Sequence, residues 1–479
     1  MELSLLKMSQ AGVSFTDFPM ELQLKILSQV NLAQILTLLK IHPWKDAILD
    51  YLTIEARRAR KNPSYYPLLD KFRYDAKFVD FFNYNYDELA RQNPNLSSWT
   101  NREPVAWFLS AHQMLKEASV FDQKKCSIHV LDAASPMHNP VLNTNVVCFT
   151  RNKKLCIWRR QNQQMHYIDC TETPVENIWT CKSNIELYAS EKYIIYAAIS
   201  DNGHVQIRAY CTINFNLLWG LQSAKSYNYT TLRIISVDPN GRILICVQRS
   251  DEADIEEEGL AADFEDMDTT EATYLFAGPQ ATDVTEIETV INTEALSQKL
   301  YLFGSVFYKL TLEKCARYFG SAVNIKCVKL PFSKMGAGAE EEEVFKQRTL
   351  FTIPDDVGLA YLGNEICFWY HDRLEFRISS VDDLRTVVTP VDLRCKSDIN
   401  VLVNGETITL TGFDQIHAQT FVLKFYRKDD QTKTVSYQRA FLKQSVSPHS
   451  VHTSDSAIAI LHPSRVYLEV YDYLSPLVG

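Results

Sequence analysis

The chain has 479 residues, of which 46% are hydrophobic and 22% charged, a composition typical of globular protein and a length that allows more than one domain. Its formal net charge of -9 argues against an extended nucleic-acid-binding surface, because neutralising phosphates needs clustered lysine and arginine. No secretory signal opens the sequence and no apolar run is long enough to span a bilayer, so we expect a cytoplasmic and/or nuclear protein with neither a nucleic-acid nor a membrane partner.

Three helical patterns are predicted in the first 60 residues. The first begins near Asp17, which can cap a helix N-terminus, and Pro19, whose missing N–H has no intrahelical partner in the first turn. A second helix follows within residues 31–42, with Asn31 as its expected cap, and a third lies within residues 45–61. The second pattern is apolar on more than one side, which is too much apolar surface for a helical hairpin that packs only against itself.

The segment 61–125 is predicted to form a helical linker that packs on the domain after it. Four prolines interrupt it, and helical periodicity returns in EPVAWFLSAHQMLKEASVF. Its aromatic content is too high for a solvated spacer. We therefore expect the linker to be ordered.

From residue 126 to residue 479, short β-branched and aromatic runs alternate with turn residues. Asn-Gly steps that separate paired runs, as in KYIIYAAISDNGHVQIRAY, LRIISVDPNGRILICVQ and INVLVNGETITL, favour tight antiparallel hairpins because they readily adopt positive φ. The fold class is therefore mainly β with an N-terminal α-helical module, and the β-region is predicted to be a β-propeller of seven or eight blades. Internal repetition is weak, so β-sandwich domains remain the alternative.

Two acidic segments interrupt the predicted strands. Residues 250–271 contain no basic residue, and residues 334–344 combine small residues with four consecutive glutamates. Both are predicted to be mobile loops. For the first, docking of a basic partner and regulation by phosphorylation stay open beside the simpler interpretation, a solvated loop.

Signatures of catalysis are missing from the sequence. It contains no nucleophile elbow, zinc-protease helix, Walker loop or dinucleotide fingerprint, and its 11 cysteines include no CxxC pair. We expect the cysteines to be reduced and buried in strands. The sequence therefore predicts no enzymatic activity, no catalytic residue, no metal site and no cofactor.

The segment FTDFPMELQLKILSQVNLAQILTLLKIHPWKDAIL resembles an F-box, the three-helix module by which substrate receptors attach to the Skp adaptor of Skp–cullin–F-box ubiquitin ligases. Phe18-Pro19 stands where that family has Leu-Pro, Glu21 stands at its acidic residue, and Ile26-Leu27-Ser28 matches its ILS. Two departures lie near Trp44: the spacing from the ILS is one residue shorter than usual, and His42-Pro43 replaces a cysteine followed by a basic residue.

The resemblance implies that residues 15–60 form an F-box that binds the Skp adaptor and, through it, a cullin. The residues expected to contact the adaptor are Phe18, Pro19, Leu22, Ile26, Leu27, Ile35, Leu36, Leu39 and Trp44. An F-box, a helical linker and a propeller together are similar to the WD-repeat class of F-box receptors. The implied function is recruitment of an unidentified protein substrate for ubiquitination. The alternative is a non-ligase scaffold that binds the adaptor, or another helical partner, through the same helices.

The positions of arginines in the β-region would indicate whether the protein substrate is acidic or basic. A planar guanidinium matches phosphate oxygens bidentately, so three or more arginines at one end of the propeller channel would indicate a phosphorylated or acidic target. An acidic or apolar channel mouth would instead indicate a basic or unmodified target. The arginines in or beside predicted strands are Arg159, Arg160, Arg208, Arg233, Arg242, Arg249, Arg377 and Arg394.

Overall fold

The structure, a computed structural model, describes residues 15, 18–28, 30, 32–39, 44–62, 65, 68, 87, 91, 102–122, 125–170, 185–200, 202–227, 231–238, 240–248, 272–287, 295–303, 306–314, 322–331, 342–350, 357–362, 365–370, 375–380, 383–388, 400–404, 407–414, 418–429, 434–443 and 448–474.

The longer helices described in the first 120 residues are α2 (Met20–Leu27), α3 (Leu32–Leu38), α4 (Lys45–Ala59) and α7 (Arg102–Ala118). Pro19, and not Asp17 as expected, occupies the N-cap position of α2, where no side chain donates or accepts a capping hydrogen bond. The reason is that Pro19 has an extended backbone with ψ of 146°, so the helix can begin only after it. Asn31, the expected cap of the second helix, lies outside the described residues. None of the described helices is long and apolar enough to cross a membrane.

The described strands form seven antiparallel sheets of four strands, which we call blades 1 to 7. Blade 1 contains β2 (His138–Leu142), β3 (Val146–Arg151), β4 (Lys154–Arg159) and β5 (Gln164–Asp169); blade 2 contains β6 (Ile185–Ala189), β7 (Tyr193–Ile199), β8 (His204–Cys211) and β9 (Leu217–Ser226). Blade 3 contains β10 (Thr231–Val237), β11 (Ile243–Gln248), β12 (Ala272–Ala277) and β13 (Thr285–Ile287); blade 4 contains β14 (Ala295–Phe303), β15 (Val306–Lys314), β16 (Ala322–Pro331) and β17 (Glu342–Leu350). Blade 5 contains β18 (Val357–Leu362), β19 (Glu365–Tyr370), β20 (Glu375–Ser380) and β21 (Asp383–Val388); blade 6 contains β22 (Asn400–Asn404), β23 (Thr407–Asp414), β24 (Gln419–Asp429) and β25 (Thr434–Lys443). Blade 7 contains β26 (Ser450–Thr453), β27 (Ala457–Leu461), β28 (Tyr467–Asp472) and, from the other end of the β-region, β1 (Ser127–Asp132).

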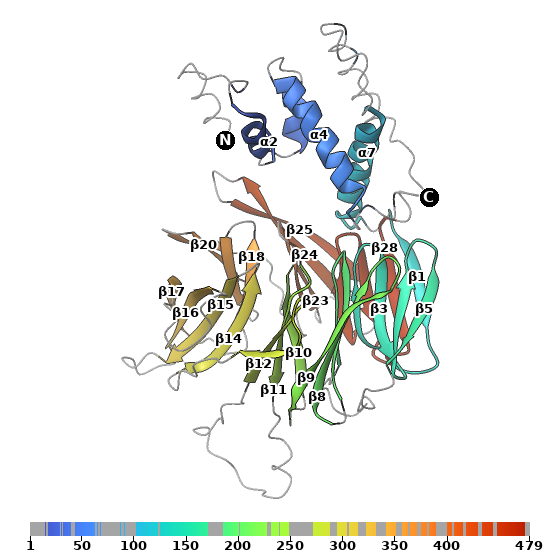
Figure 1. Ribbon diagram of the computed structural model, residues 1–479, viewed down its shortest axis with the longest axis vertical. Coiled ribbons are helices and arrows are strands. Elements are labelled where there is room, and N and C mark those ends of the chain that lie inside the picture. Colours follow the sequence, from blue (N-terminus) through green and yellow to red (C-terminus); the bar gives the residue numbers. More distant parts are fainter. Residues whose placement is uncertain are drawn as a thin grey trace, which may run out of the picture.

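The first strands of neighbouring blades contact one another around a ring. Strand β6 lies between β2 and β10, β10 also contacts β14, and β22 lies between β18 and β26, which contacts β2. Between β14 and β18, the Tyr301 side chain hydrogen bonds to the backbone of Leu359. The sheets thus follow one another around an axis, as the sequence of colours in Figure 1 shows. This radial order is that of a β-propeller, so the β-sandwich alternative is wrong.

The two ends of the β-region meet in blade 7. Strand β1 pairs antiparallel with β28, from Ser127 opposite Asp472 to Asp132 opposite Tyr467. Strand β28 also pairs with β27 on its other side. The last strand thus pairs within the blades, and this pairing closes the ring because the first and last strands share one sheet.

The Asn-Gly hairpins form as predicted. In the turn between β7 and β8, Gly203 has φ of +75°, and in the turn between β10 and β11, Gly241 has φ of +79°. A Cβ atom on Gly203 would lie 2.8 Å from the carbonyl oxygen of Tyr227 and 2.6 Å from the Ser226 hydroxyl. Both the backbone angle and the space around it therefore require glycine at position 203.

Gly203→Ala is expected to lower the free energy of unfolding by about 2 kcal/mol, because alanine is strained at positive φ and also meets backbone atoms here. Urea denaturation followed by fluorescence measures the change. Gly220→Ala is the matched control, because the nearest atom to its added Cβ is 3.6 Å away. Equal losses in the two variants would contradict the role assigned to Gly203.

The helices share a hydrophobic core with blades 6 and 7. Buried side chains of α4 and α7 join one cluster with Val422 and Leu442 of blade 6 and Ile458 of blade 7. Where the chain passes from α7 to β1, the ring of Phe121 packs edge-on against Tyr473, with the ring centroids 5.2 Å apart. In Figure 1 the helices accordingly lie together at one side of the propeller, next to β25 and β28.

The two acidic segments fall mostly outside the described residues. This holds for all of residues 250–271 and for 334–341. Strand β17 begins at Glu342, which pairs with Lys329 of β16, so the end of the second expected loop is wrong: residues 342–344 belong to the sheet. Backbone pairing with a neighbouring strand outweighs the local charge repulsion that indicated a loop.

Replacing residues 250–271 by Gly-Gly is expected to leave the melting temperature within about 2 °C of the original. The segment joins two strands whose last and first residues, Gln248 and Ala272, already lie opposite each other in the sheet. A short hairpin loop is therefore long enough to connect them. Differential scanning calorimetry measures the result, and a large drop would mean that the segment contributes to the core.

Candidate partner-binding surfaces

The nine residues expected to contact an adaptor differ in exposure. Four are buried in the chain's own core: Leu27, Ile35, Leu36 and Leu39. Three are half-buried and pack against that core: Phe18, Ile26 and Trp44. Two are exposed: Pro19 and Leu22. In the described structure the first group stabilises the helices, so the apolar surface offered to a partner is smaller than the nine residues suggest.

One exposed apolar surface lies at the beginning of α2. The side chains of Met20 and Leu22 are 42% and 45% exposed, and Pro19 precedes them. We call these three residues the α2 face. Met20 was not among the expected contact residues, although its position one residue after Pro19, at the start of the helix, is a signal in the sequence. Met20 and Leu22 are two residues apart and project from different sides of the first turn, so the exposed apolar surface is the start of the helix as a whole and not one stripe along it.

Aromatic stacking fixes the entry to α2. The ring of Phe15 stacks on Trp44, which precedes α4, with centroids 3.7 Å apart and an interplanar angle of 9°. The backbone N–H of Phe18 donates to the Phe15 carbonyl at 3.3 Å, and the side-chain amide of Gln23 donates to the Phe18 carbonyl at 2.7 Å. The α2 face is therefore held in position by contacts behind it.

Helix α7 connects helices α2, α3 and α4 to the propeller. Tyr65 packs against Trp107 and Phe108 of α7, and its hydroxyl lies 3.3 Å from Nδ1 of His112. Burial lowers the pKa of His112, so the neutral imidazole is favoured at this position. Phe121, just after α7, then contacts blade 7 as described above. The helices and the propeller are thus joined by packed side chains as well as by the chain itself.

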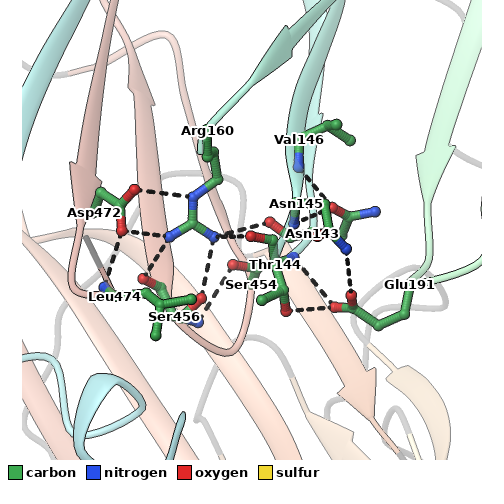
Figure 2. Close-up of polar contacts among 10 residues, drawn as sticks. All are labelled: Asn143, Thr144, Asn145, Val146, Arg160, Glu191, Ser454, Ser456, Asp472 and Leu474. Carbon is green, nitrogen blue, oxygen red and sulfur yellow. Dashed lines mark hydrogen bonds and ion pairs between the residues drawn. The ribbon is translucent and has the colours of Figure 1, made fainter. Parts of the chain in front are cut away.

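Arg160 of blade 1 is buried at the centre of a polar cluster that joins three blades (Figure 2). Its guanidinium donates to both carboxylate oxygens of Asp472 in blade 7, at 2.6 and 3.3 Å, and the two side chains are 3% and 1% exposed. It also donates to the Ser456 carbonyl of blade 7 and to the Asn143 and Thr144 carbonyls of blade 1. Such a fully satisfied ion pair is a structural element and not a site for a ligand.

The same cluster extends to blade 2. The carboxylate of Glu191, between β6 and β7, accepts hydrogen bonds from the Thr144 hydroxyl at 2.7 Å and the Thr144 N–H at 3.2 Å. Burial raises the pKa of Glu191, while the bonds from Thr144 act in the opposite direction. We call this group the ring-closing cluster: Asn143, Thr144, Arg160, Glu191, Ser456 and Asp472.

The side chains of five of the eight arginines are described, and their contacts differ. Arg160 is buried as above, and Arg242 pairs with Asp238 in the turn before β11, at 2.5 Å. Arg233, on the inner strand β10, acts on Glu186 of β6. Burial raises the pKa of Glu186 and Arg233 opposes this rise, with a net pKa of about 7. Arg159 of blade 1 donates to the Ile213 carbonyl of blade 2, and Arg208 of blade 2 acts electrostatically on Cys170, which follows β5 of blade 1. Arg249, Arg394 and the side chain of Arg377 lie outside the described residues.

Cysteines and metal-ligating groups add no further site in the described part of the chain. Its cysteines are all free, and burial raises the pKa of the Cys246 thiol to about 11. A thiol of that kind is a poor nucleophile. No group of three or more His, Cys, Asp or Glu side chains among the described residues is placed to hold a metal ion.

Comparison with known proteins finds distant structural likenesses only. No family model and no curated protein matches the sequence. The β-propeller domain of the Trilobed protease from Pyrococcus furiosus is similar at 10% identity and a TM-score of 0.43, over 71% of this chain and 95% of that one. The WD40 domain of SCAP from fission yeast is similar at 9% identity and a TM-score of 0.37, over 74% and 97%.

A peptidase is also among the similar structures. The acylaminoacyl peptidase from Pyrococcus horikoshii matches at 11% identity and a TM-score of 0.39, over 68% of this chain. The match spans 49% of the peptidase, so this chain corresponds to about half its length. Likenesses at TM-scores below 0.5 carry no argument, and the fold described above follows from the pairing of the strands.

Proposed function

We propose that the chain is the substrate-recognition subunit of a Skp–cullin–F-box ubiquitin ligase and has no catalytic role of its own. One observation carries the proposal: the segment that resembles an F-box exposes Met20 and Leu22 on its first helix, while the rest of its apolar surface is packed behind them. An apolar face held in this way is suited to burial in a partner.

The proposed mechanism is proximity. The α2 face binds the Skp adaptor, the adaptor binds a cullin, and the propeller holds a protein target near the conjugating enzyme of the assembled ligase. Holding both in one complex raises the effective concentration of the target lysine. Packing of Phe121 on Tyr473 and the core shared with blades 6 and 7 support this role, because they keep the helices at a fixed distance from the propeller.

Affinity purification of the tagged full-length chain from cells tests the proposal. Co-purification of the Skp adaptor together with a cullin is the expected result. Adaptor without cullin would support the alternative, a scaffold outside a ligase. Recovery of neither protein, from a chain that is folded by its melting curve, would contradict the ligase function and would leave only a scaffold for another helical partner.

A further inference from the structure

A second exposed apolar surface lies at the rim of the propeller, where blades 1 and 2 meet. Ile213, in the turn between β8 and β9, and Leu217 and Leu218, at the start of β9, are 44%, 56% and 50% exposed. All three lie within six residues of one another on the same hairpin of blade 2. Exposing large apolar side chains to water is unfavourable. Several of them close together on one hairpin therefore indicate a surface that contacts another molecule.

A cationic and aromatic stack borders these side chains. The guanidinium of Arg159, at the end of β4, lies over the ring of Phe215 at 4.8 Å and donates a hydrogen bond to the Ile213 carbonyl. The ring of His166, on β5, packs against Phe215 with centroids 4.8 Å apart. Nε2 of His166 is buried and has no hydrogen-bond partner among the described residues. The stack fixes the direction of the Arg159 guanidinium before any ligand arrives.

Basic side chains outnumber acidic ones around this surface. In a chain with 58 acidic and 49 basic residues, segments 151–168 and 202–237 contain no aspartate or glutamate. These segments include β4, the β8–β9 hairpin and all of β5 except its last residue, Asp169, which pairs with Lys154. Arg159 has no carboxylate partner among the described residues, unlike Arg160 and Arg242, which are both ion-paired. The surface is therefore complementary to negative charge as well as to apolar side chains.

We infer that the rim patch, formed by Arg159, His166, Ile213, Phe215, Leu217 and Leu218, binds a segment of a protein partner that carries apolar side chains next to carboxylates or phosphates. The apolar side chains of the segment pack on the hairpin tip, and its anionic group accepts hydrogen bonds from the Arg159 guanidinium. A protein segment fits better than nucleic acid or a membrane, because one fixed arginine beside three apolar side chains suits a mixed apolar and acidic surface.

The rim patch is suited to hold the target of the proposed ligase. This assignment of the patch as the target-binding site rests on the proposed function. The Thr212 hydroxyl, in the β8–β9 turn, donates to the Glu191 carbonyl at 2.7 Å, so the patch adjoins the ring-closing cluster. That cluster leads through Asp472 to Tyr473, which packs on Phe121 next to the helices. A target bound at the rim patch would thus lie on the side of the propeller that carries the helical module.

Selection from a phage-displayed library of random 12-residue peptides tests the inference without the adaptor. Full-length wild-type protein is the bait, and the variant Arg159→Glu, Leu217→Ser, Leu218→Ser is used for counter-selection. The expected result is enrichment of peptides that combine Asp or Glu with apolar residues. Basic peptides, peptides that bind both proteins equally, or no enrichment would overturn the inference.

Fluorescence polarisation with the best-enriched peptide, labelled with fluorescein, measures each contribution. We expect Arg159→Glu and the Leu217→Ser, Leu218→Ser pair each to weaken binding about tenfold or more. Lys125→Glu and Val130→Ser change exposed residues outside the patch and serve as controls for charge and apolar surface. Unchanged melting curves exclude unfolding, and equal binding by patch and control variants would contradict the assignment.

The experiments distinguish failure of the proposed function from failure of the inference about the rim patch. Patch variants are expected to co-purify the Skp adaptor as wild type does, because the patch belongs to blades 1 and 2 and the α2 face belongs to the helices. Adaptor binding without peptide binding would overturn the rim patch alone. Peptide binding without adaptor binding would overturn the ligase proposal alone.

Discussion

Arg160→Ala is expected to lower the free energy of unfolding by about 3–5 kcal/mol, the largest loss of stability expected from a single substitution here. The change removes six hydrogen bonds and leaves the buried Asp472 carboxylate without its cation. An unpaired charge at 1% exposure is costly because it has lost both water and its partner. Urea denaturation measures the loss.

Neighbouring variants separate this effect from general damage. Arg159→Ala changes the adjacent, partly exposed arginine and is expected to cost less than about 1 kcal/mol. Arg160→Lys keeps the positive charge but loses the planar guanidinium that donates to both carboxylate oxygens. Its loss of stability is therefore expected to lie between those of Arg159→Ala and Arg160→Ala. The double variant Arg160→Met, Asp472→Leu is expected to be more stable than Arg160→Ala, because no charge then remains buried. Arg160→Ala with wild-type stability would contradict the role of the ring-closing cluster.

The variant Met20→Asp, Leu22→Asp is expected to reduce binding of the Skp adaptor by at least about 30-fold, equivalent to about 2 kcal/mol. Both side chains are exposed in the free chain, so the change places charge where the partner surface would be apolar while leaving the core intact. Isothermal titration calorimetry with purified adaptor measures the loss of affinity.

The choice of these two residues follows from burial. Ile26→Asp, Leu27→Asp is a less direct test, because Leu27 is 0% exposed and a charge there would unfold the helices themselves. Tyr167→Asp, on an exposed propeller side chain, is the control for an apolar-to-acidic change. Wild-type affinity in the Met20→Asp, Leu22→Asp variant would mean that the α2 face does not bind the adaptor.

Much of the fold could be predicted from the sequence, because its signals are local. Asn-Gly steps mark hairpins wherever positive φ is needed, and Gly203 and Gly241 both adopt it. The start of α2 was predicted less well, since Asp17 and Pro19 both suit a helix start and the backbone of Pro19 decides between them. The start of strand β17 was not predicted, because its glutamates favour a loop locally. Its pairing with β16 depends on residues elsewhere in the chain, which no local pattern reports.

The candidate surfaces were harder to predict, because exposure depends on packing partners distant in sequence. Leu22 and Leu27 both belong to the apolar pattern of α2, but five residues at about 100° each place them about 140° apart, so one faces solvent and the other the core. Arg159 and Arg160 are adjacent and chemically alike, yet one is stacked at the rim and the other is paired with Asp472, 312 residues away. No rule of sequence spacing distinguishes such residues, because their partners are known only once the arrangement of the blades is known.

Hydrogen–deuterium exchange of the full-length chain, with and without purified Skp adaptor, tests the central claim most directly. Binding through the α2 face predicts slower amide exchange in Met20–Leu27 when the adaptor is present, with exchange in blades 1 to 5 unchanged. Exchange in Met20–Leu27 that stays the same at saturating adaptor, or protection confined to the propeller, would contradict the claim that this helix attaches the chain to a ubiquitin ligase.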